Sequence, residues 1–237
     1  MDEFSRTRML LGRAAMDKLK NARVAVFGVG GVGGYVVEAL ARSGVGSLVL
    51  IDNDKVSLTN INRQIIALHS SMGRYKTEVM RERILDINPE AQVDIHTCFF
   101  LPENADNFDF STYDYVVDAV DTVTAKIEIV MRTKKENKPV ISAMGAGNKL
   151  DASKLVVTDI YSTQMCPLAK VMRKELRNRG VKELKVVYSI EQPIKPMIAE
   201  GEEAQDNTHR ITPGSISYVP STAGLLLAGE VIKDIIS

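Results

Sequence analysis

The chain has 237 residues, of which 45% are hydrophobic and 25% charged, and 30 lysines and arginines balance 30 aspartates and glutamates. These proportions are those of an ordinary globular protein and exclude a disordered or collagen-like chain. A net charge of zero excludes a uniformly basic nucleic-acid-binding protein, although a local basic patch can still be present. The length predicts one large domain, or one domain with an extension.

The cysteines and the two ends of the chain predict a cytoplasmic protein without membrane contacts. Cys98 and Cys166 are too few for a disulfide framework or a four-cysteine zinc site, so we expect reduced thiols. The N-terminus carries Asp2 and Glu3 and lacks the basic start and apolar centre of a signal peptide. The apolar stretch 222–236 is too short and too charged to span a bilayer.

Short β-branched runs alternate with helical patterns over residues 1–147. The predicted strands are 24–27, 47–51, 92–97, 114–118 and 139–142, and the predicted helices are 35–42, 74–85 and about 123–136. This alternation is typical of a Rossmann-like α/β fold, a doubly wound and mainly parallel sheet with helices on both faces. We interpret residues 1–147 as a nucleotide-binding core.

The pattern changes after residue 147. Strands 155–160 and 184–190 bracket a helix at about 167–179, and a last helix is predicted at about 221–235. The polar segment 191–214 has no apolar period, which predicts a flexible loop. We interpret residues 148–237 as an extension of the same domain that faces the substrate and forms a dimer contact.

A glycine-rich turn joins the first predicted strand to the first helix. Its glycines are Gly28, Gly30, Gly31 and Gly33, which satisfy both GxGxxG and GxGGxG. Small residues let the backbone approach phosphates, and the helix N-terminus offers free N–H groups and the positive end of its dipole. Asp52, about 20 residues further on, stands where a carboxylate accepts ribose hydroxyls. The turn therefore predicts a nucleotide site but does not decide which nucleotide binds.

The polar loop 52–64 favours ATP over a dinucleotide. It lies just past the carboxyl end of the predicted sheet, where open α/β sheets bind ligands, and its candidates are Asp54, Asn60, Arg63 and Gln64. Arg63 can grip phosphate oxygens with two parallel hydrogen bonds, and Lys76 can reach the same phosphates from the next helix. An alternative interpretation makes both of them ordinary surface charges.

Two carboxylates end another strand at the same edge. Asp118 and Asp121 can supply oxygen ligands to Mg²⁺, whereas a structural interpretation makes Asp121 the N-cap of the following helix. A dehydrogenase would need a histidine or lysine beside a carboxylate for hydride transfer. The three histidines, His69, His96 and His209, show no such pairing in the sequence.

Together these motifs resemble the ubiquitin-activating-enzyme superfamily, which includes bacterial proteins that adenylate sulfur-carrier proteins. The resemblance covers most of the chain and is strongest over residues 5–147. It implies that Asp52 binds the ribose, that Arg63 and Lys76 bind the phosphates, and that Asp121 holds magnesium. It also implies that Asn60 contacts the nucleotide.

The same resemblance implies a homodimer. Arg6 is similar to the arginine that these dimers donate to the ATP of the neighbouring subunit, with Arg8 and Arg13 as alternatives. Lys126 takes the place where many relatives have arginine.

Two observations narrow the resemblance to a subgroup. The chain lacks the paired CxxC motifs of zinc-binding members, so no zinc is expected, and Cys166 is the one candidate for a thioester, with a structural role favoured. Segments 142–151 and 166–169 look like the enzymes that cyclise threonylcarbamoyladenosine in tRNA. The implied reaction activates the threonyl carboxylate with ATP, and the ring then closes within the substrate, which requires no thiol.

A basic stretch fits a tRNA substrate. Residues 165–187 carry seven lysines and arginines against two glutamates, and Arg173 and Arg177 share one helix face. We predict that Lys170, Arg173 and Arg177 contact tRNA, and the alternative is a solvated charged face. Three other functions stay open: an activator of a ubiquitin-like or sulfur-carrier protein with a sulfur-transfer partner, an NAD-dependent oxidoreductase, and a nucleotide-sensing scaffold.

Overall fold

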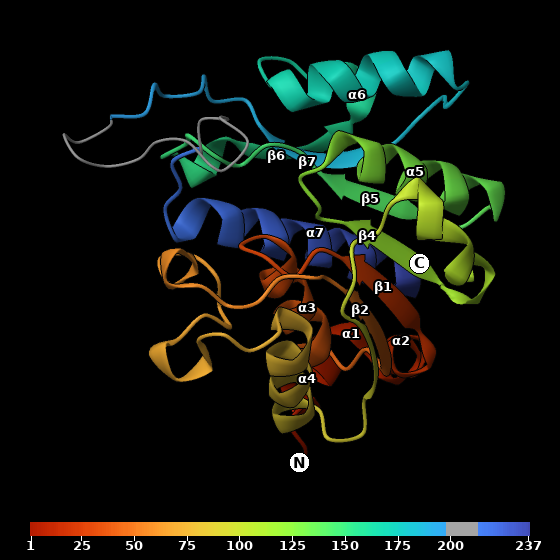
Figure 1. The fold of residues 1–237 in the computed structure, drawn as a ribbon. Coiled ribbons are helices and arrows are strands. Elements are labelled where there is room, and N and C mark those ends of the chain that lie inside the picture. Colours follow the sequence, from red (N-terminus) through yellow and green to blue (C-terminus); the bar gives the residue numbers. More distant parts are fainter. Residues whose placement is uncertain (198–212) are drawn as a thin grey trace.

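The protein is a three-layer α/β structure around one sheet, described by a computed structural model for residues 1–197 and 213–237 (Figure 1). The strands are β1 (Arg23–Phe27), β2 (Ser47–Ile51), β3 (Gln92–His96), β4 (Tyr115–Asp118), β5 (Val140–Ala143), β6 (Leu155–Asp159) and β7 (Lys185–Ser189). They form a seven-stranded sheet in the order β3-β2-β1-β4-β5-β7-β6. Only the β6–β7 pair is antiparallel. The predicted Rossmann-like fold is confirmed.

Helices cover both faces of the sheet. One face carries α2 (Arg13–Asn21), α3 (Gly33–Arg42), α4 (Lys76–Ile87) and α7 (Tyr218–Ile236), and the other carries α5 (Val123–Lys135) and α6 (Pro167–Asn178). Helix α1 (Ser5–Leu11) precedes them. In Figure 1 α6 and α7 lie on opposite sides of β7. No helix of the described ranges is long and apolar enough to cross a membrane.

Short 3-10 helices occur in the connections. They are η1 (Leu58–Asn60), η2 (His69–Ser71), η3 (Pro102–Asn107), η4 (Phe110–Thr112), η5 (Ala152–Lys154) and η6 (Ile160–Ser162). Of the predicted loop 191–214, residues 191–197 and 213–214 have no regular structure, and residues 198–212 lie outside the described residues.

Burial on both faces explains why the strands read as continuous apolar runs. In β1, Val24 and Val26 face the α3 side, whereas Ala25 and Phe27 face the α5 side. Phe27 packs there against three phenylalanines at centroid distances of 4.8, 6.1 and 5.6 Å, namely Phe100, Phe108 and Phe110. These rings fill the space beside α5.

Several predicted helix boundaries differ from the structure, and two of the differences have a clear physical reason. Helix α4 begins at Lys76 rather than at residue 74, because Tyr75 still pairs with Lys55 in an isolated antiparallel bridge. Helix α7 begins at Tyr218 rather than at residue 221, because Pro220 lies in the first turn, where proline sacrifices no helical hydrogen bond.

The C-terminal part is built into the sheet and its core. Strands β6 and β7 continue the sheet beyond β5, and α7 packs along α3. Leu227 and Val231 are fully buried within this chain, whereas Leu225 is 49% exposed. Leu227 and Val231 therefore serve the core of this chain, and the dimer contact expected of residues 148–237 stays a prediction that does not involve these two side chains.

Helix α7 approaches α3 closely at one glycine. A Cβ on Gly224 would lie 2.4 Å from the carbonyl oxygen of Val32 and 2.8 Å from the Cβ of Tyr35. Val32 is the N-cap of α3 and belongs to the glycine-rich turn. The last helix of the chain therefore supports the backbone of the first βα connection.

We predict that Gly224→Ala destabilises the protein by about 1–3 kcal/mol, because the added methyl group overpacks this crossing. Gly229→Ala is the matched control on the same helix, since no atom lies within 4 Å of its Cβ position. Alanine there should stabilise by about 0.5–1 kcal/mol through its higher helix propensity. Urea denaturation measures both changes, and equal effects of the two substitutions would contradict the close crossing.

Candidate nucleotide-binding site

Two glycines are required by the shape of the turn between β1 and α3. Gly28 has φ of 88°, and a Cβ there would lie 2.7 Å from the carbonyl oxygen of Ala119. A Cβ on Gly33 would lie 1.8 Å from the carbonyl oxygen of Gly28, closer than any real contact. Only glycine fits at these two positions, which brings the start of α3 directly against the ends of β1 and β4.

The other two glycines lie under the polar loop. A Cβ on Gly31 would lie 3.3 Å from Arg63 Cγ, and one on Gly30 would lie 3.8 Å from Gln64 Nε2. The structure thus brings this loop against the glycine turn, as the sequence predicts. Backbone N–H groups, a guanidinium and an amide converge at one place, a set of donors suited to phosphate oxygens.

Asp52 connects β2 to the glycine turn. Its Oδ2 accepts a hydrogen bond from the Val29 N–H at 2.7 Å, and its Oδ1 accepts one from the Asp54 N–H at 2.8 Å. Burial raises the pKa of Asp52, and the positive charge of Lys76 opposes that shift. Each carboxylate oxygen has about two lone pairs, so further acceptor capacity remains for a ligand hydroxyl.

Lys76 lies at the start of α4, where it pairs with Asp54 and is close enough to Asp52 for their charges to interact. Its Nζ lies 2.6 Å from Asp54 Oδ2, and its side chain is 6% exposed against 54% for that of Asp54. The Lys76 N–H also donates to the carbonyl oxygen of Asp54 at 2.9 Å. The structure therefore holds a nearly buried ammonium next to Asp52, with one carboxylate partner that faces solvent.

Asn60 and Arg63, two further residues of the loop, both form hydrogen bonds within the loop. Asn60 is buried, and its Oδ1 accepts from the Ser57 N–H at 3.1 Å in a capping box, so this oxygen serves the loop itself. Arg63 Nη1 donates to the Thr59 carbonyl at 2.8 Å and to Asn62 Oδ1 at 3.0 Å, contacts that aim the guanidinium along the loop.

Gln64 has an unused polar atom. Its side chain is buried, and Oε1 has no hydrogen-bond partner among the described residues. A buried acceptor without a partner costs about 1–3 kcal/mol. Since Gln64 Nε2 lies against Gly30, the orphaned oxygen belongs to the wall of the candidate site, where a ligand donor or water would satisfy it.

An ion pair lies beneath the turn at the end of β4. Asp118 and Lys126 are both fully buried, with Lys126 Nζ 2.9 Å from Asp118 Oδ2. Lys126 Nζ also donates to the carbonyl oxygen of Val120 at 3.0 Å, and the Val120 N–H donates to Asp118 Oδ1 at 3.3 Å. The pair thus fixes the segment that presses on Gly28.

This ion pair corrects the expectation that Asp118 shares a magnesium ion with Asp121, because Asp118 is fully buried and neutralised by Lys126. Asp121 is exposed just beyond, and the N-cap of α5 is Thr122, so the helix-cap interpretation of Asp121 does not hold. Within residues 1–197 and 213–237, no group of three metal-binding side chains is assembled. The exposed Asp121 carboxylate would be able to supply an oxygen ligand to a magnesium ion at this edge.

The pairing of Lys126 with Asp118 was not predicted from the sequence. The available signal was a lysine in the first turns of a helix whose neighbouring positions, Ala125 and Ile129, are apolar and buried. A lysine in such a position requires a buried carboxylate.

Lys126→Met should destabilise the protein by about 3–5 kcal/mol, because it leaves the Asp118 carboxylate buried without compensation. The double variant Asp118→Asn/Lys126→Met should recover most of that loss, since the asparagine carbonyl can still accept from Val120. Chemical denaturation of the three proteins gives the coupling energy. If the single and double variants proved equally unstable, the pair would not act as a unit.

Arg6 lies far from the glycine turn of its own chain. Phe4 packs against Gly44, and the N-terminal residues line an open cavity of about 880 Å³ together with Ser47 and Gln92, where β2 and β3 begin. That is the amino edge of the sheet, whereas the glycine turn lies at the carboxyl edge. Strand β2 separates the two edges by about 16 Å at 3.3 Å per residue.

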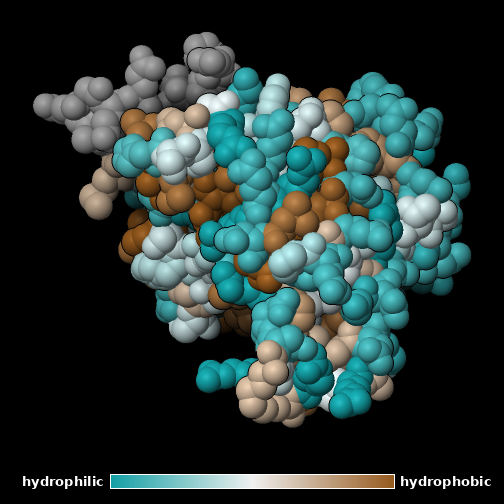
Figure 2. Space-filling view, turned by 90° about the horizontal axis from the view of Figure 1, so that it is seen from below, coloured by the Kyte–Doolittle hydropathy of each residue, from teal (hydrophilic) through white to brown (hydrophobic). Residues whose placement is uncertain are grey.

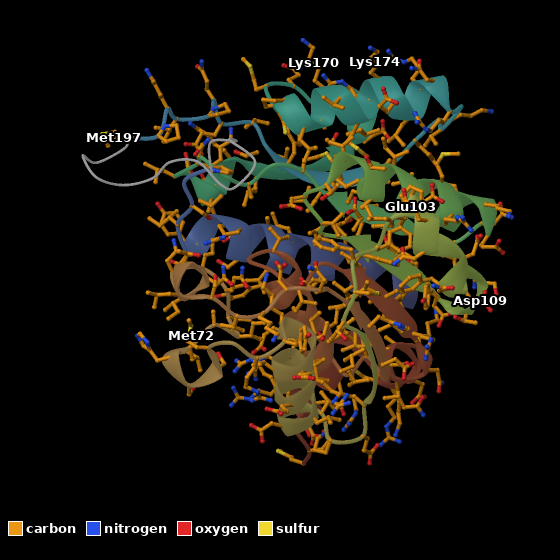
Figure 3. All side chains as sticks on the ribbon, viewed as in Figure 1. Met72, Glu103, Asp109, Lys170, Lys174 and Met197 are labelled. Carbon is orange, nitrogen blue, oxygen red and sulfur yellow. The ribbon has the colours of Figure 1, made fainter. Side chains whose placement is uncertain are left out.

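The residues predicted to contact tRNA differ in their exposure and in their contacts within the chain. Arg173 is half-buried and Nη1 donates to the Thr163 carbonyl at 2.9 Å, so it holds the chain before α6. The Arg177 guanidinium lies over the Tyr161 ring at 5.2 Å from its centroid. Lys170 and Lys174 point away from the body of the molecule (Figure 3). Arg173 is therefore engaged inside the chain rather than displayed.

Neither cysteine is fully exposed to solvent. Cys166 is buried at the N-cap of α6, where its Sγ accepts from the Ala169 N–H at 3.5 Å. Burial raises the pKa of Cys98, which disfavours its thiolate.

Comparison with known proteins agrees with this geometry. The model of the ThiF family matches residues 4–237. The chain belongs to the ThiF family. The resemblance to the ubiquitin-activating-enzyme superfamily is thereby confirmed.

Within the ThiF family, the chain is similar to enzymes of one kind along its full length. It is 42% identical over 244 residues to the tRNA threonylcarbamoyladenosine dehydratase of Bacillus subtilis, covering 100% of this chain and 95% of that protein. It is 34% identical over 248 residues to the Escherichia coli enzyme of the same name, covering 97% and 92%.

A solved structure of the Escherichia coli tRNA N6-threonylcarbamoyladenosine dehydratase in complex with ATP gives a TM-score of 0.88 at 33% identity, covering 99% of this chain and 93% of that one. The same enzyme in complex with AMP gives a TM-score of 0.89 at the same identity, covering 99% and 94%.

Proposed function

We propose that this chain is an ATP-dependent tRNA threonylcarbamoyladenosine dehydratase. The observation that carries the proposal is the full-length similarity to enzymes of that name, joined to a site in which Asp52 and Arg63 contact the glycine turn and Lys76 pairs with Asp54 close by. Asp52 would bind the ribose of ATP, and the N–H groups of the turn would meet its phosphates.

The residues of the site divide the first step between them. The threonyl carboxylate of the modified base attacks the α-phosphate of ATP, and pyrophosphate leaves. Lys76 and Arg63 would stabilise the charge that grows on the phosphoryl oxygens. Asp121 would hold Mg²⁺, which neutralises phosphate charge when bound. The resulting acyl-adenylate is closed by a group of the same base, with departure of AMP.

The second step requires little of the protein beyond holding the substrate, because nucleophile and acyl group belong to one molecule. This agrees with the surroundings of Cys166, which is buried as a helix N-cap. A protein activator that passes its modifier onward as a thioester would need an accessible thiol. The alternative function, activation of a ubiquitin-like or sulfur-carrier protein with a sulfur-transfer partner, is therefore less well supported.

We also propose a homodimer in which Arg6 completes the site of the partner subunit. Helix α1 has no buried residue within this chain, and its Met9 and Leu10 are 72% and 86% exposed. Figure 2 views the molecule from below relative to Figure 1, and on that face apolar surface (brown) is exposed among polar side chains. A helix with apolar residues in solvent, located at the sheet edge away from its own site, suits a subunit contact.

The reaction can be tested with tRNA that carries threonylcarbamoyladenosine. The protein with ATP and Mg²⁺ should convert the base to its cyclic form, seen by mass spectrometry of digested nucleosides, with AMP and pyrophosphate released. Lys76→Ala should slow this by roughly 10²-fold or more. Lys233→Ala, at an exposed lysine of α7 outside the loop, is the control and should keep the wild-type rate. Stimulation of AMP release by a carrier protein with a C-terminal Gly-Gly, and not by tRNA, would contradict the proposal.

The homodimer makes a separate prediction by complementation. Arg6→Ala and Lys76→Ala should each be inactive as homodimers, whereas a mixture that exchanges subunits should regain part of the activity. The reason is that a mixed dimer contains one site with both residues intact. Demonstrated subunit exchange without recovery would show that Arg6 does not act in the partner's site.

A further inference from the structure

Four exposed lysines on the α5–α6 face have no carboxylate partner. They are Lys135, Lys170, Lys174 and Lys182, none of which forms an ion pair within the described part of the chain. We name this set the α6 track. Other cations nearby are paired, for example Arg179 with Glu175 at 2.6 Å.

The α6 track runs from one edge of the sheet to the other. Cys166, at the start of α6, has its Sγ 3.6 Å from the Cβ position of Gly145, which follows β5 at the carboxyl edge. Helix α6 ends near the start of β7 at the amino edge, after 12 residues. At about 1.5 Å per residue, it covers roughly 18 Å.

The two ends of the track are shaped differently. Lys170 and Lys174 stand on the outer face of α6 and extend into solvent (Figure 3). Lys182 and Lys135 line an open cavity of about 590 Å³ between the end of α5 and the turn after α6. The α6 track therefore begins at the carboxyl edge of the sheet, where the candidate nucleotide site lies, and ends at the amino edge in a cavity lined by basic side chains.

Local helix electrostatics do not account for this arrangement. A cation near a helix C-terminus interacts favourably with the dipole, which explains Lys135 at the end of α5. Lys170 and Lys174 are the fourth and eighth residues of α6, outside its last turn, so the helix dipole gives them no stabilisation. They are also four residues apart, a like-charge spacing that destabilises a helix. An external polyanion would remove this repulsion.

We propose that the α6 track binds the phosphate backbone of the tRNA and so directs the tRNA toward the carboxyl edge of the sheet, where the candidate nucleotide site lies. This rests on the proposed function. Lysines that contact phosphates supply affinity without reading sequence, which suits a substrate chosen by one modified base. The track replaces the predicted set of Lys170, Arg173 and Arg177 in part. Lys170 remains, whereas Arg173 contacts Thr163 and Arg177 lies over the Tyr161 ring. Lys174, Lys135 and Lys182 are added.

The test is binding of fluorescently labelled tRNA carrying threonylcarbamoyladenosine to the full chain at several salt concentrations. Lys170→Gln/Lys174→Gln and Lys135→Gln/Lys182→Gln should each weaken binding roughly tenfold near physiological salt. Each pair should also lower the slope of log K against log salt by about 1.4–1.8, the value for two lost phosphate contacts.

The matched control is Lys20→Gln/Lys233→Gln, which removes the same charge from exposed lysines on α2 and α7, on the other face of the sheet. It should bind tRNA as the wild type does. All variants should bind ATP with unchanged affinity by calorimetry, which shows that they are folded.

The outcomes separate the two proposals. If the wild type cyclises the base and the track variants keep its affinity and salt slope, the α6 track is wrong and the function stands. Equal weakening by the control pair would also overturn the track, since net charge alone would then explain binding. If the wild type fails to cyclise the base, the proposed function fails, whatever the track variants bind.

Discussion

At the glycine turn, backbone packs directly against backbone, and this close contact positions the elements that form the candidate site. Gly28 and Gly33 bring the start of α3 against the ends of β1 and β4, with no room for a single methyl group. This closeness sets the free N–H groups of α3 directly above the sheet edge, where the nucleotide phosphates are proposed to lie. Gly224 of α7 then supports the same turn from the other side, against Val32.

Charges are arranged around that turn in two tiers. Beneath it, the buried pair of Asp118 and Lys126 neutralises itself and fixes the backbone at Val120. Above it, Asp52 is held by two backbone N–H groups, while Lys76 has one exposed partner. The lower tier can give no charge to a ligand without leaving a buried ion alone. In the upper tier, Lys76 can exchange its contact with the solvent-facing Asp54 for a phosphate at little cost in free energy, because water can then solvate the Asp54 carboxylate.

The C-terminal residues decide which surface is left for a macromolecule. Helix α7 takes one face of the sheet and buries Leu227 and Val231 against α3. Strands β6 and β7 widen the sheet, so α6 forms the outer layer of the opposite face. Because α6 starts at the carboxyl edge, its two lysines without a carboxylate partner in the described residues, Lys170 and Lys174, lie on a path that begins at the same sheet edge as the candidate site.

The fold class, the glycine turn, and the meeting of Asp52, Arg63 and Lys76 at one edge of the sheet can all be predicted from the amino-acid sequence. These follow from local sterics and from the rule that parallel strands end at a common edge. The ion pair of Asp118 with Lys126 and the hydrogen bond from Arg173 to Thr163 become visible when the chain is folded. The partner of a charged side chain depends on packing between segments distant in the chain, and the residue type alone carries no record of it.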